Sequence, residues 1–473
     1  VYSYPDKGDY FSPSYNYPEY KFNHTSRKEN VIYDMVRSVL FNLGYDASNY
    51  NTPTWNPLGH IVSPGDVVLI KPNMVLDRSL NPHHPSTDCL ITHPSIVRAV
   101  IDYVLIALDN KGTVIIADAP LQNCDFRRLC DKTGYFNIIE FYSQRTAVHF
   151  ELIDLRKIES VMQQNMEITV FEREGDPRGY TTIDLKDLSL HDEKKDLTKR
   201  FRVTNYDVFN MQNFHNKYHH YYIISNTVLQ SNVIINLPKP KTHRKAGLTA
   251  ALKNMIGIIG HKECLPHHTQ GSVSTGGDEY QFDDINKRLS VYFIEMRNYC
   301  SINGDKELFK FFAEQAAHYS ELARKSGLNK FSEGSWYGND TIWRTTLDLN
   351  RIIFYADKHG TMRKEKQRKY FALGDMIVSG EEEGPLEPTP KNVGVILGSE
   401  DPVLFDCAVA MIMGFAYHLI PTIYNALKFE DFRLSDRYTD IEMDINSNVP
   451  IEDLNCHFTP SRGWKDILSS TSI

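Results

Sequence analysis

Residues 232–262 read NVIINLPKPKTHRKAGLTAALKNMIGIIGHK, and this stretch decides the fold. It opens with an apolar run that ends at a proline, as a strand buried on both faces of a sheet does. Lys239, Lys241 and His243 then recur at every second position, and an extended backbone places such residues on one side. Residues 248–259 show apolar residues at helical spacing, with small residues on the opposite face. The stretch predicts an anion site where a buried strand meets a helix.

Two more apolar strands are predicted at 67–70 and 114–117, with a helix at 94–108 between them. This order is the βαβ pattern of a parallel sheet, in which ligands bind beyond the carboxyl ends of the strands. Polar residues follow both strands at once: Lys71, Asn73 and Asp118. They are therefore expected to meet the basic loop at one edge of the sheet.

The predicted fold class is α/β, with a mostly parallel central sheet flanked by helices, a polar β-rich insertion and helical additions. The expected parts are an N-terminal arm and helix (1–65), a first βαβ part of the core (66–150), the insertion (151–230), a second part of the core with a helical hairpin (231–430) and a C-terminal tail (431–473).

Composition narrows the functional classes. The net charge of −8 argues against a nucleic-acid partner, because phosphate-backbone binding needs a densely basic surface. No apolar run reaches the roughly eighteen residues of a membrane-spanning helix, and no signal-peptide pattern opens the sequence, so a cytoplasmic location is expected. The seven cysteines are dispersed without a C-x-x-C pair, which predicts reduced thiols and no iron–sulfur cluster.

A third region, residues 370–415, adds carboxylates. The alternation of FALGDMIV places Asp375 among apolar neighbours, and residues 379–388 are predicted as a Gly- and Pro-rich loop that bears Glu383. Asp406 lies inside a helix that is apolar nearly all round, so it must be paired, hydrogen-bonded or bound to a metal. These three acids are candidate ligands of Mg²⁺ or another hard divalent cation, which prefers oxygen ligands.

Several motifs together resemble the domain of unknown function 362 family. They are VLIKPN at 68–73, THP at 92–94, INLPKPKTH at 235–243, ALKNMIGIIGHK at 251–262, LGDMIVSGEEEGP at 373–385 and GVILGSEDPVLFDCAVAMIMGF at 394–415. The arm with YPEY and WNPLG is similar to a bacterial branch found beside polysaccharide-biosynthesis genes. The resemblance implies no agreed catalytic assignment, but its motifs mark the following positions: Lys71, Asn73, Lys239, Lys241, His243, Lys253, Asn254, Asp375, Glu383, Gly384, Asp401 and Asp406.

Three interpretations remain open. The first is an enzyme that binds a small anionic metabolite, phosphorylated or carboxylated, with a sugar nucleotide as one candidate and metal-assisted group transfer or acid/base chemistry as its reaction. The second is an isomerase or lyase that uses His and Lys for proton transfer. The third is a non-catalytic binding or scaffold protein of a biosynthetic complex. The oligomeric state is left open.

The site prediction assigns roles residue by residue. The catalytic candidates are His243, Lys241 and Asp118; the substrate-binding candidates are Lys71, Asn73, Lys239, Lys253, Asn254 and His261; the metal candidates are Asp375, Glu383 and Asp406.

Overall fold

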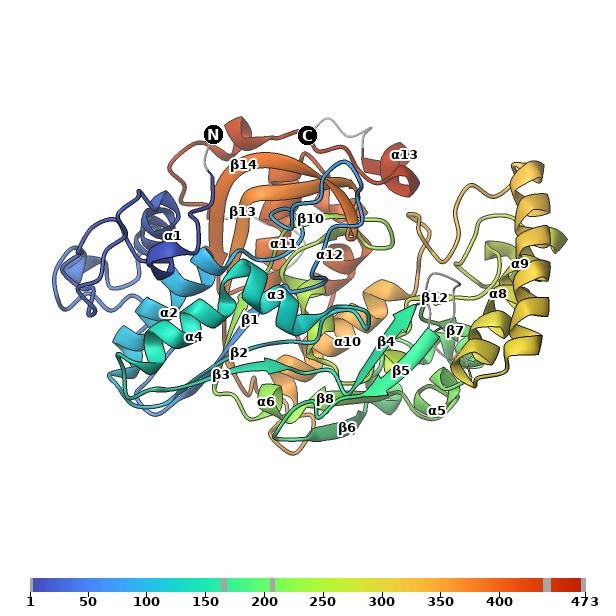
Figure 1. The fold of residues 1–473 in the computed structure, drawn as a ribbon, viewed down its shortest axis with the longest axis horizontal. Coiled ribbons are helices and arrows are strands. Elements are labelled where there is room, and N and C mark those ends of the chain that lie inside the picture. The colour runs from blue at the N-terminus through green and yellow to red at the C-terminus, as the bar shows by residue number, and fades with distance from the viewer. Residues whose placement is uncertain (1–2, 163–167, 205–208, 437–443, 469–473) are drawn as a thin grey trace.

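A central sheet organises the chain in the computed structural model, which describes residues 3–162, 168–204, 209–436 and 444–468 (Figure 1). Its strands lie in the order β3 (His149–Asp154), β2 (Thr113–Asp118), β1 (Val67–Pro72), β9 (Val233–Leu237), β13 (Lys369–Glu383), β10 (Lys241–His243) and β11 (Gly247–Thr249). From β3 to β10, every pair of neighbouring strands is parallel. Strand β11 pairs antiparallel with β10, and the additional strand β14 (Glu387–Ser399) pairs antiparallel with β13. The predicted mixed α/β class with a mostly parallel sheet is confirmed.

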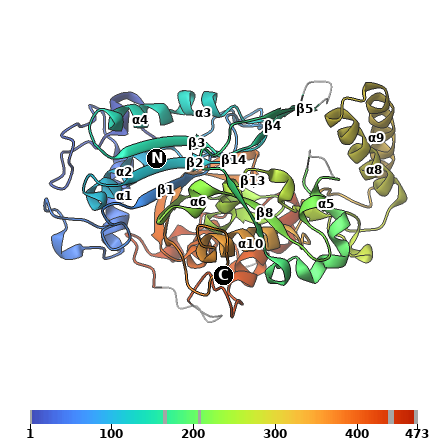
Figure 2. The ribbon, with the colours of Figure 1, turned by 90° about the horizontal axis from the view of Figure 1, so that it is seen from below.

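Helices cover both faces of this sheet, because successive strand residues point to opposite sides. Val68 and Ile70 pack with α1 (Val31–Asn42), α2 (Pro94–Leu108), α3 (Phe126–Thr133) and α4 (Tyr135–Ser143), whereas Leu69 packs with α10 (Ile342–Tyr355), α11 (Pro402–Met413) and α12 (Pro421–Ala426). Figure 2 shows α3 and α4 across the sheet from α10. The core is therefore two apolar layers around one sheet.

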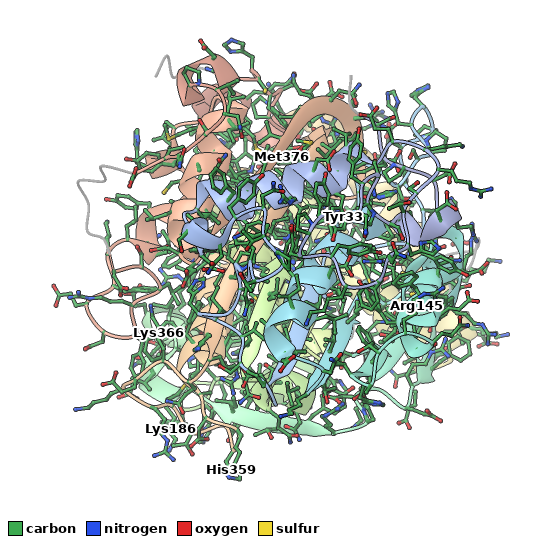
Figure 3. The ribbon with its side chains drawn as sticks, turned by 90° about the vertical axis from the view of Figure 1, so that its left-hand side faces the viewer. Tyr33, Arg145, Lys186, His359, Lys366 and Met376 are labelled. Carbon is green, nitrogen blue, oxygen red and sulfur yellow. The ribbon has the colours of Figure 1, made fainter. Side chains whose placement is uncertain are left out.

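Side-chain burial follows the same division between core and surface. Tyr33 and Met376 are buried, whereas Lys186, His359 and Lys366 are exposed and reach the margin of the molecule (Figure 3). None of the helices in the described ranges has the length and apolar character needed to cross a bilayer.

The helix ends are fixed by local side chains. His93 Nδ1 accepts a hydrogen bond from the Ser95 amide at the start of α2, and Pro94 takes the first helical position, where a missing N–H costs nothing. Asp401 caps α11 by accepting from the amides of Val403 and Leu404. The boundaries predicted for α2 match those observed.

The polar region after the first βαβ part forms small antiparallel sheets. β4 (Ile158–Met162) pairs with β5 (Ile168–Glu172), β6 (Tyr180–Asp184) pairs with β8 (Tyr221–Ser225), and β7 (Phe201–Arg202) pairs with β12 (His268–Thr269). The short helices α5 (Met211–Phe214) and α6 (Asn226–Leu229) lie in the same region. The boundary predicted at 151 falls inside β3, which belongs to the central sheet.

A helical hairpin projects from the body on the right of Figure 1. It consists of α8 (Ile285–Ile302) and α9 (Lys306–Ser326), which pack against each other. The last helix of the described residues is α13 (Lys465–Leu468). Just before it, Trp464 Nε1 donates a hydrogen bond to the carbonyl of Arg244 at 2.9 Å. The C-terminal segment thus packs on the basic loop.

Two predicted local structures are wrong. Residues 248–259 do not form one helix: they contain β11, a single turn α7 (Ala251–Asn254) and a 3-10 turn (Met255–Ile258). Gly247 has a φ of 80°, which allows the chain to turn back so that β11 pairs with β10. The expected loop at 379–388 is also shorter, because β13 continues to Glu383 and β14 resumes at Glu387. Tertiary strand pairing outweighs local pattern in both places.

Candidate functional site

A cavity of about 400 Å³ opens at the carboxyl ends of β1 and β2, beside β10. Its wall carries the basic side chains Lys241, Arg244, Lys245, Lys253 and Lys262. The other lining residues that bear on binding are Asn73, Asp118, His243, Asn254, Gly257 and His267. Among the described residues Asp118 is the one carboxylate of this lining. The wall is therefore strongly cationic, which favours an anionic ligand.

A buried ion pair supports the floor of the cavity: Asp118 lines the cavity, whereas Lys71, a predicted substrate-binding residue, is fully buried and does not. Lys71 Nζ lies 2.7 Å from Asp118 Oδ1 and donates to the carbonyl of Pro72 at 2.8 Å. Asp118 Oδ2 accepts from the Met74 amide at 2.7 Å. Burial lowers the pKa of Lys71, and the neighbouring carboxylate opposes that shift. Asp118 is thus neutralised by its own partners and leaves the charge of the wall positive.

Lys241 lies above this floor without a carboxylate partner in the described structure. Its Nζ donates to the carbonyls of Leu90 (2.8 Å) and Lys239 (3.2 Å) and to Asn73 Oδ1 (3.3 Å). Burial, followed by the charge of Lys239, lowers its pKa to about 7. Lys241 therefore exchanges a proton near neutral pH, as a general acid or base must.

Lys253 is the least constrained cation of the wall. It makes no hydrogen bond or ion pair with any residue that the structure describes. Burial lowers its pKa to about 7, and the charges of Lys262 and Lys245 act in the same direction. An anion between these ammonium groups would relieve their repulsion.

Lys245 and Lys262 complete the basic wall. Lys245 Nζ donates to Thr204 Oγ1 at 3.1 Å, and Lys262 Nζ donates to the carbonyl of Ala119 at 2.7 Å. Burial lowers the pKa of each to about 8. Both remain largely protonated at neutral pH and supply fixed positive charge.

His243 presents a hydrogen-bond donor to the cavity. Its Nδ1 accepts from the amides of Lys245 (3.0 Å) and Ala246 (3.2 Å), so the proton of the neutral ring resides on Nε2. Burial, then the charges of Lys253 and Arg244, lower the pKa of His243 well below its usual value. The ring is therefore neutral and can donate to a ligand oxygen.

An amide chain connects this region to the sheet. Asn73 Nδ2 donates to Asn254 Oδ1 at 3.0 Å, and Asn254 Nδ2 donates to Asn236 Oδ1 at 2.7 Å. Because each amide orients the next, Asn73 holds its own Oδ1 toward Lys241. The structure thus brings six of the predicted residues to one cavity: Asn73, Asp118, Lys241, His243, Lys253 and Asn254.

Lys239 belongs to a separate buried network. Its Nζ lies 3.1 Å from Asp375 Oδ2 and donates to Tyr4 Oη at 2.6 Å, while Tyr4 Oη in turn donates to Asp375. The His93 amide donates to Asp375 Oδ2 at 2.9 Å, and the Tyr4 and His93 rings stack at 4.1 Å. The N-terminal arm closes this network, so neither Lys239 nor Asp375 lines the cavity.

The remaining predicted residues also lie elsewhere. His261 faces Phe214 and Glu263 rather than the cavity. Glu383 pairs with Arg462 at 3.2 Å, and Asp406 accepts from the amides of Ala251 and Leu252 at the start of α7. Burial raises the pKa of Asp406 to about 8, so the apolar helix α11 holds a largely neutral carboxyl group that these two amides bond.

The three predicted metal ligands consequently do not form one metal site. Asp375, Glu383 and Asp406 are each bound by different protein groups. Within the described ranges, no group of three or more His, Cys, Asp or Glu side chains is arranged to hold a metal ion. The residues do not fit the expected shared Mg²⁺ site.

Sequence reasoning missed Arg244, Lys245, Lys262 and His267. The prediction used the alternation of side chains in an extended segment, which selects residues 239, 241 and 243. The turn between β10 and β11 also brings Arg244 and Lys245 to the same cavity. Lys262 follows the 3-10 turn Met255–Ile258 and reaches the cavity with its Nζ bonded to the carbonyl of Ala119. The density of basic residues in KTHRK was the available signal.

The fold and the site define an open, mostly parallel α/β protein with a cationic cavity at the carboxyl edge of its sheet. The family model described as Domain of unknown function (DUF362) matches residues 68–165 and 137–411, which is more than half of the chain. The chain belongs to this family. Comparisons with curated proteins and with solved structures find no match.

Proposed function

We propose that this protein is an enzyme that binds a small phosphorylated or carboxylated metabolite in the cationic cavity and moves a proton on it. The observation that carries this proposal is the set of Lys241, Arg244, Lys245, Lys253 and Lys262 around about 400 Å³, with Asp118 already paired to Lys71. A cavity of this size suits a small molecule. Desolvated ammonium groups without carboxylate partners favour an anion that supplies the missing charge.

Lys241 and His243 supply the proposed chemistry. The pKa of Lys241, about 7, allows it to take or give a proton at neutral pH. His243 Nε2–H would stabilise negative charge that develops on a ligand oxygen. Lys253 and Lys262 would hold the anionic group. The reaction class is acid/base chemistry on an anionic metabolite.

Two broader expectations remain part of the proposal. A sugar nucleotide is the candidate ligand to test first, in line with the resemblance to a polysaccharide-biosynthesis branch, and the cytoplasm is the expected location. Neither carries the argument for the cavity, which rests on charge and geometry alone.

Binding of anions to the purified protein tests the proposal. Inorganic phosphate, pyrophosphate, UDP and a set of carboxylic acids are measured by calorimetry and by thermal stabilisation, since selective binding raises the melting temperature by mass action. Lys253→Met should weaken binding about ten- to a hundredfold, because it removes one charge-assisted contact of about 1.5–3 kcal/mol. Lys310→Met, at an exposed lysine of α9, is the matched control.

Flat responses to all anions would refute the enzyme proposal and favour the scaffold interpretation. Equal affinities of Lys253→Met and wild type would refute the location of the site. Turnover is tested separately, by exchange of ligand protons with deuterium in wild type and in Lys241→Met.

A further inference from the structure

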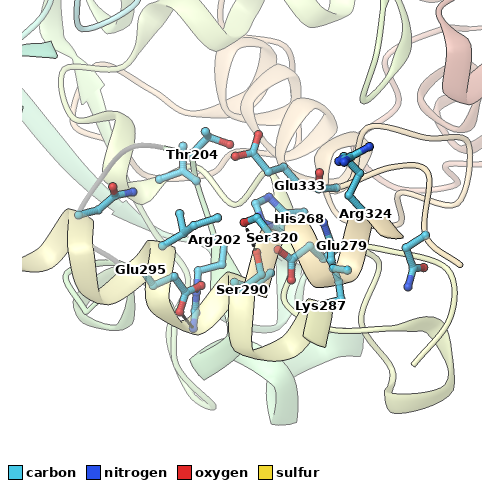
Figure 4. Close-up of a pocket in the computed structure, with 17 residues that line it drawn as sticks. Arg202, Thr204, His268, Glu279, Lys287, Ser290, Glu295, Ser320, Arg324 and Glu333 are labelled. Carbon is cyan, nitrogen blue, oxygen red and sulfur yellow. Dashed lines mark hydrogen bonds and ion pairs between the residues drawn. The ribbon is translucent and has the colours of Figure 1, made fainter. Parts of the chain in front are cut away.

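A second pocket of about 290 Å³ lies at the foot of the helical hairpin (Figure 4). Its wall comes from the end of β7, from His268 on β12, from two loops that carry Glu279 and Glu333, and from α8 and α9. Val203 and Thr204 line both this pocket and the cationic cavity. Lys245 Nζ, in the cationic cavity, donates to Thr204 Oγ1 at 3.1 Å. The two spaces are therefore neighbours that share Val203 and Thr204 as a common wall.

Part of the polar lining is already satisfied within the protein. Arg202 Nε donates to Glu295 Oε1 at 2.6 Å, and Gln270 donates to the same carboxylate at 3.0 Å. The hydroxyls of Ser290 and Ser320 bond to each other at 2.7 Å across the hairpin. These pairs hold β7, α8 and α9 together and leave other groups to face the pocket.

Four polar side chains of the lining keep unused bonding capacity. His268 is 4% exposed, and its Nδ1 has no partner among the described residues. Glu279 is 3% exposed and accepts one hydrogen bond, from the Gly271 amide at 3.1 Å. Within the described ranges, the side chains of Glu333 and Lys287 make no hydrogen bond or ion pair, and Lys287 Nζ lies 5.9 Å from the centre of the Tyr280 ring.

His268 and Glu279 are buried, whereas Lys287 and Glu333 are half-buried. Burying a polar group with unmet bonding capacity costs about 1–3 kcal/mol, so native proteins pair such groups or reserve them for ligands. Figure 4 shows Glu333, His268, Glu279 and Lys287 grouped around the middle of the pocket. Burial, with help from Glu295 and Glu333, raises the pKa of Glu279 to about 7, and burial lowers the pKa of His268 well below its usual value. The group therefore mixes acceptors and donors at neutral pH.

We propose that this second pocket binds an uncharged, hydroxyl-rich portion of the ligand whose anionic portion occupies the cationic cavity. A hydroxyl can donate to the carboxylate of Glu279 or Glu333 and accept from Lys287 or the His268 ring at once. A second anion would face two carboxylates, and an ammonium group would face Lys287. Hydroxyl groups satisfy all four side chains without a net charge.

This inference rests on the proposed function, because it assigns the other end of the same ligand. Together the two spaces describe a sugar or polyol that carries a phosphate or carboxylate group. Val203 and Thr204 would lie beside the linkage between the two portions.

Paired ligands test this assignment. UDP is compared with UDP-glucose, UDP-galactose and UDP-N-acetylglucosamine, and inorganic phosphate with glucose 1-phosphate and mannose 1-phosphate, by calorimetry on the full chain. At least one sugar-bearing ligand should bind about tenfold or more tightly than its bare anion, because one hydrogen bond to a charged group contributes about 1.5–3 kcal/mol.

Glu333→Gln and Glu279→Gln should remove that difference and leave the affinity for the bare anion unchanged. Both replacements keep size and polarity, and Glu333 makes no bond within the described structure that folding would lose. Glu307→Gln, at an exposed glutamate of α9, is the matched control.

The outcomes separate the two proposals. If bare anions bind but no sugar-bearing ligand gains affinity, or if both variants behave as wild type, the second pocket is not a ligand site and the proposed function stands. If no anion binds wild type, the proposed function fails and this inference fails with it.

Discussion

Replacing Gly257 with alanine tests the floor of the cavity directly. A Cβ at this position would lie 2.0 Å from Asp118 Oδ1 and 2.8 Å from Lys71 Nζ, so the buried ion pair must move. The backbone of Gly257 has φ −81° and ψ 19°, and alanine can adopt this negative φ. The contact with the ion pair is therefore the main source of the expected destabilisation.

The expected size of the effect follows from two opposing terms. Disrupting a buried ion pair costs about 3–5 kcal/mol, and alanine recovers about 0.4–1 kcal/mol through the unfolded chain. The free energy of unfolding should thus fall by about 2–5 kcal/mol, and the affinity for anions should fall as well, since Gly257 lines the cavity.

Urea denaturation followed by tryptophan fluorescence measures this change. Asp118→Ala and the double variant complete a mutant cycle: once the carboxylate is gone, the added methyl group has less to displace, so the two costs should not add. A Gly257→Ala protein as stable as wild type, with unchanged anion affinity, would show that the ion pair does not lie against Gly257.

Four further predictions concern pH, caps, the arm and metals. The pKa values of Lys241 and Lys253, about 7, lie below that of a lysine in the unfolded chain. The unfolded state therefore binds more protons than the folded state between pH 7 and about 10.5, and the free energy of unfolding should rise with pH over this range. Anion affinity measured by calorimetry should fall from pH 6 to pH 9, because both lysines lose their charge. An affinity that rises over that range would contradict the cationic site. Asp406→Ala leaves two amides of α7 unpaired and should cost about 1–3 kcal/mol in urea denaturation, whereas Asp406→Asn, which keeps an acceptor, should cost less. Tyr4→Phe removes the hydroxyl that bonds to both members of the Lys239–Asp375 ion pair and should cost about 1–3 kcal/mol in urea denaturation. Anion affinity should stay within twofold of wild type; a large loss of affinity would place this network in the site. EDTA should leave anion affinity unchanged, because the neutralising charges in the cavity come from lysines; loss of binding that Mg²⁺ restores would refute this.

The sheet could be predicted because its strands carry their own signals. The apolar runs that became β1, β2 and β9 each end in a proline or a polar residue, and α2 begins at Pro94 as expected. The helix predicted at residues 248–259 was wrong because the apolar spacing there reflects packing against the core. Gly247 turns the chain back so that β11 pairs with β10. Local pattern cannot reveal which partner a strand will choose.

The candidate site was predictable to the extent that strand ends converge. Lys71, Asn73 and Asp118 follow adjacent parallel strands, so topology alone brings them together. Asp375 could not be placed, because its environment depends on Tyr4, which lies 371 positions away in the chain. Nor could the second pocket be foreseen, since its lining combines β7, β12 and the hairpin, whose relative positions no spacing encodes.

The position of β13 in the sheet has a consequence for how the protein is made. This strand lies between β9 and β10, although the ribosome adds it after both. Until residues 369–383 emerge, β9 and β10 have no neighbour to bridge them, and Tyr4 has no carboxylate to bind. The central sheet can therefore be completed only after residue 383 has been synthesised, so β9 and β10 must wait for β13 while residues 244–368 are added.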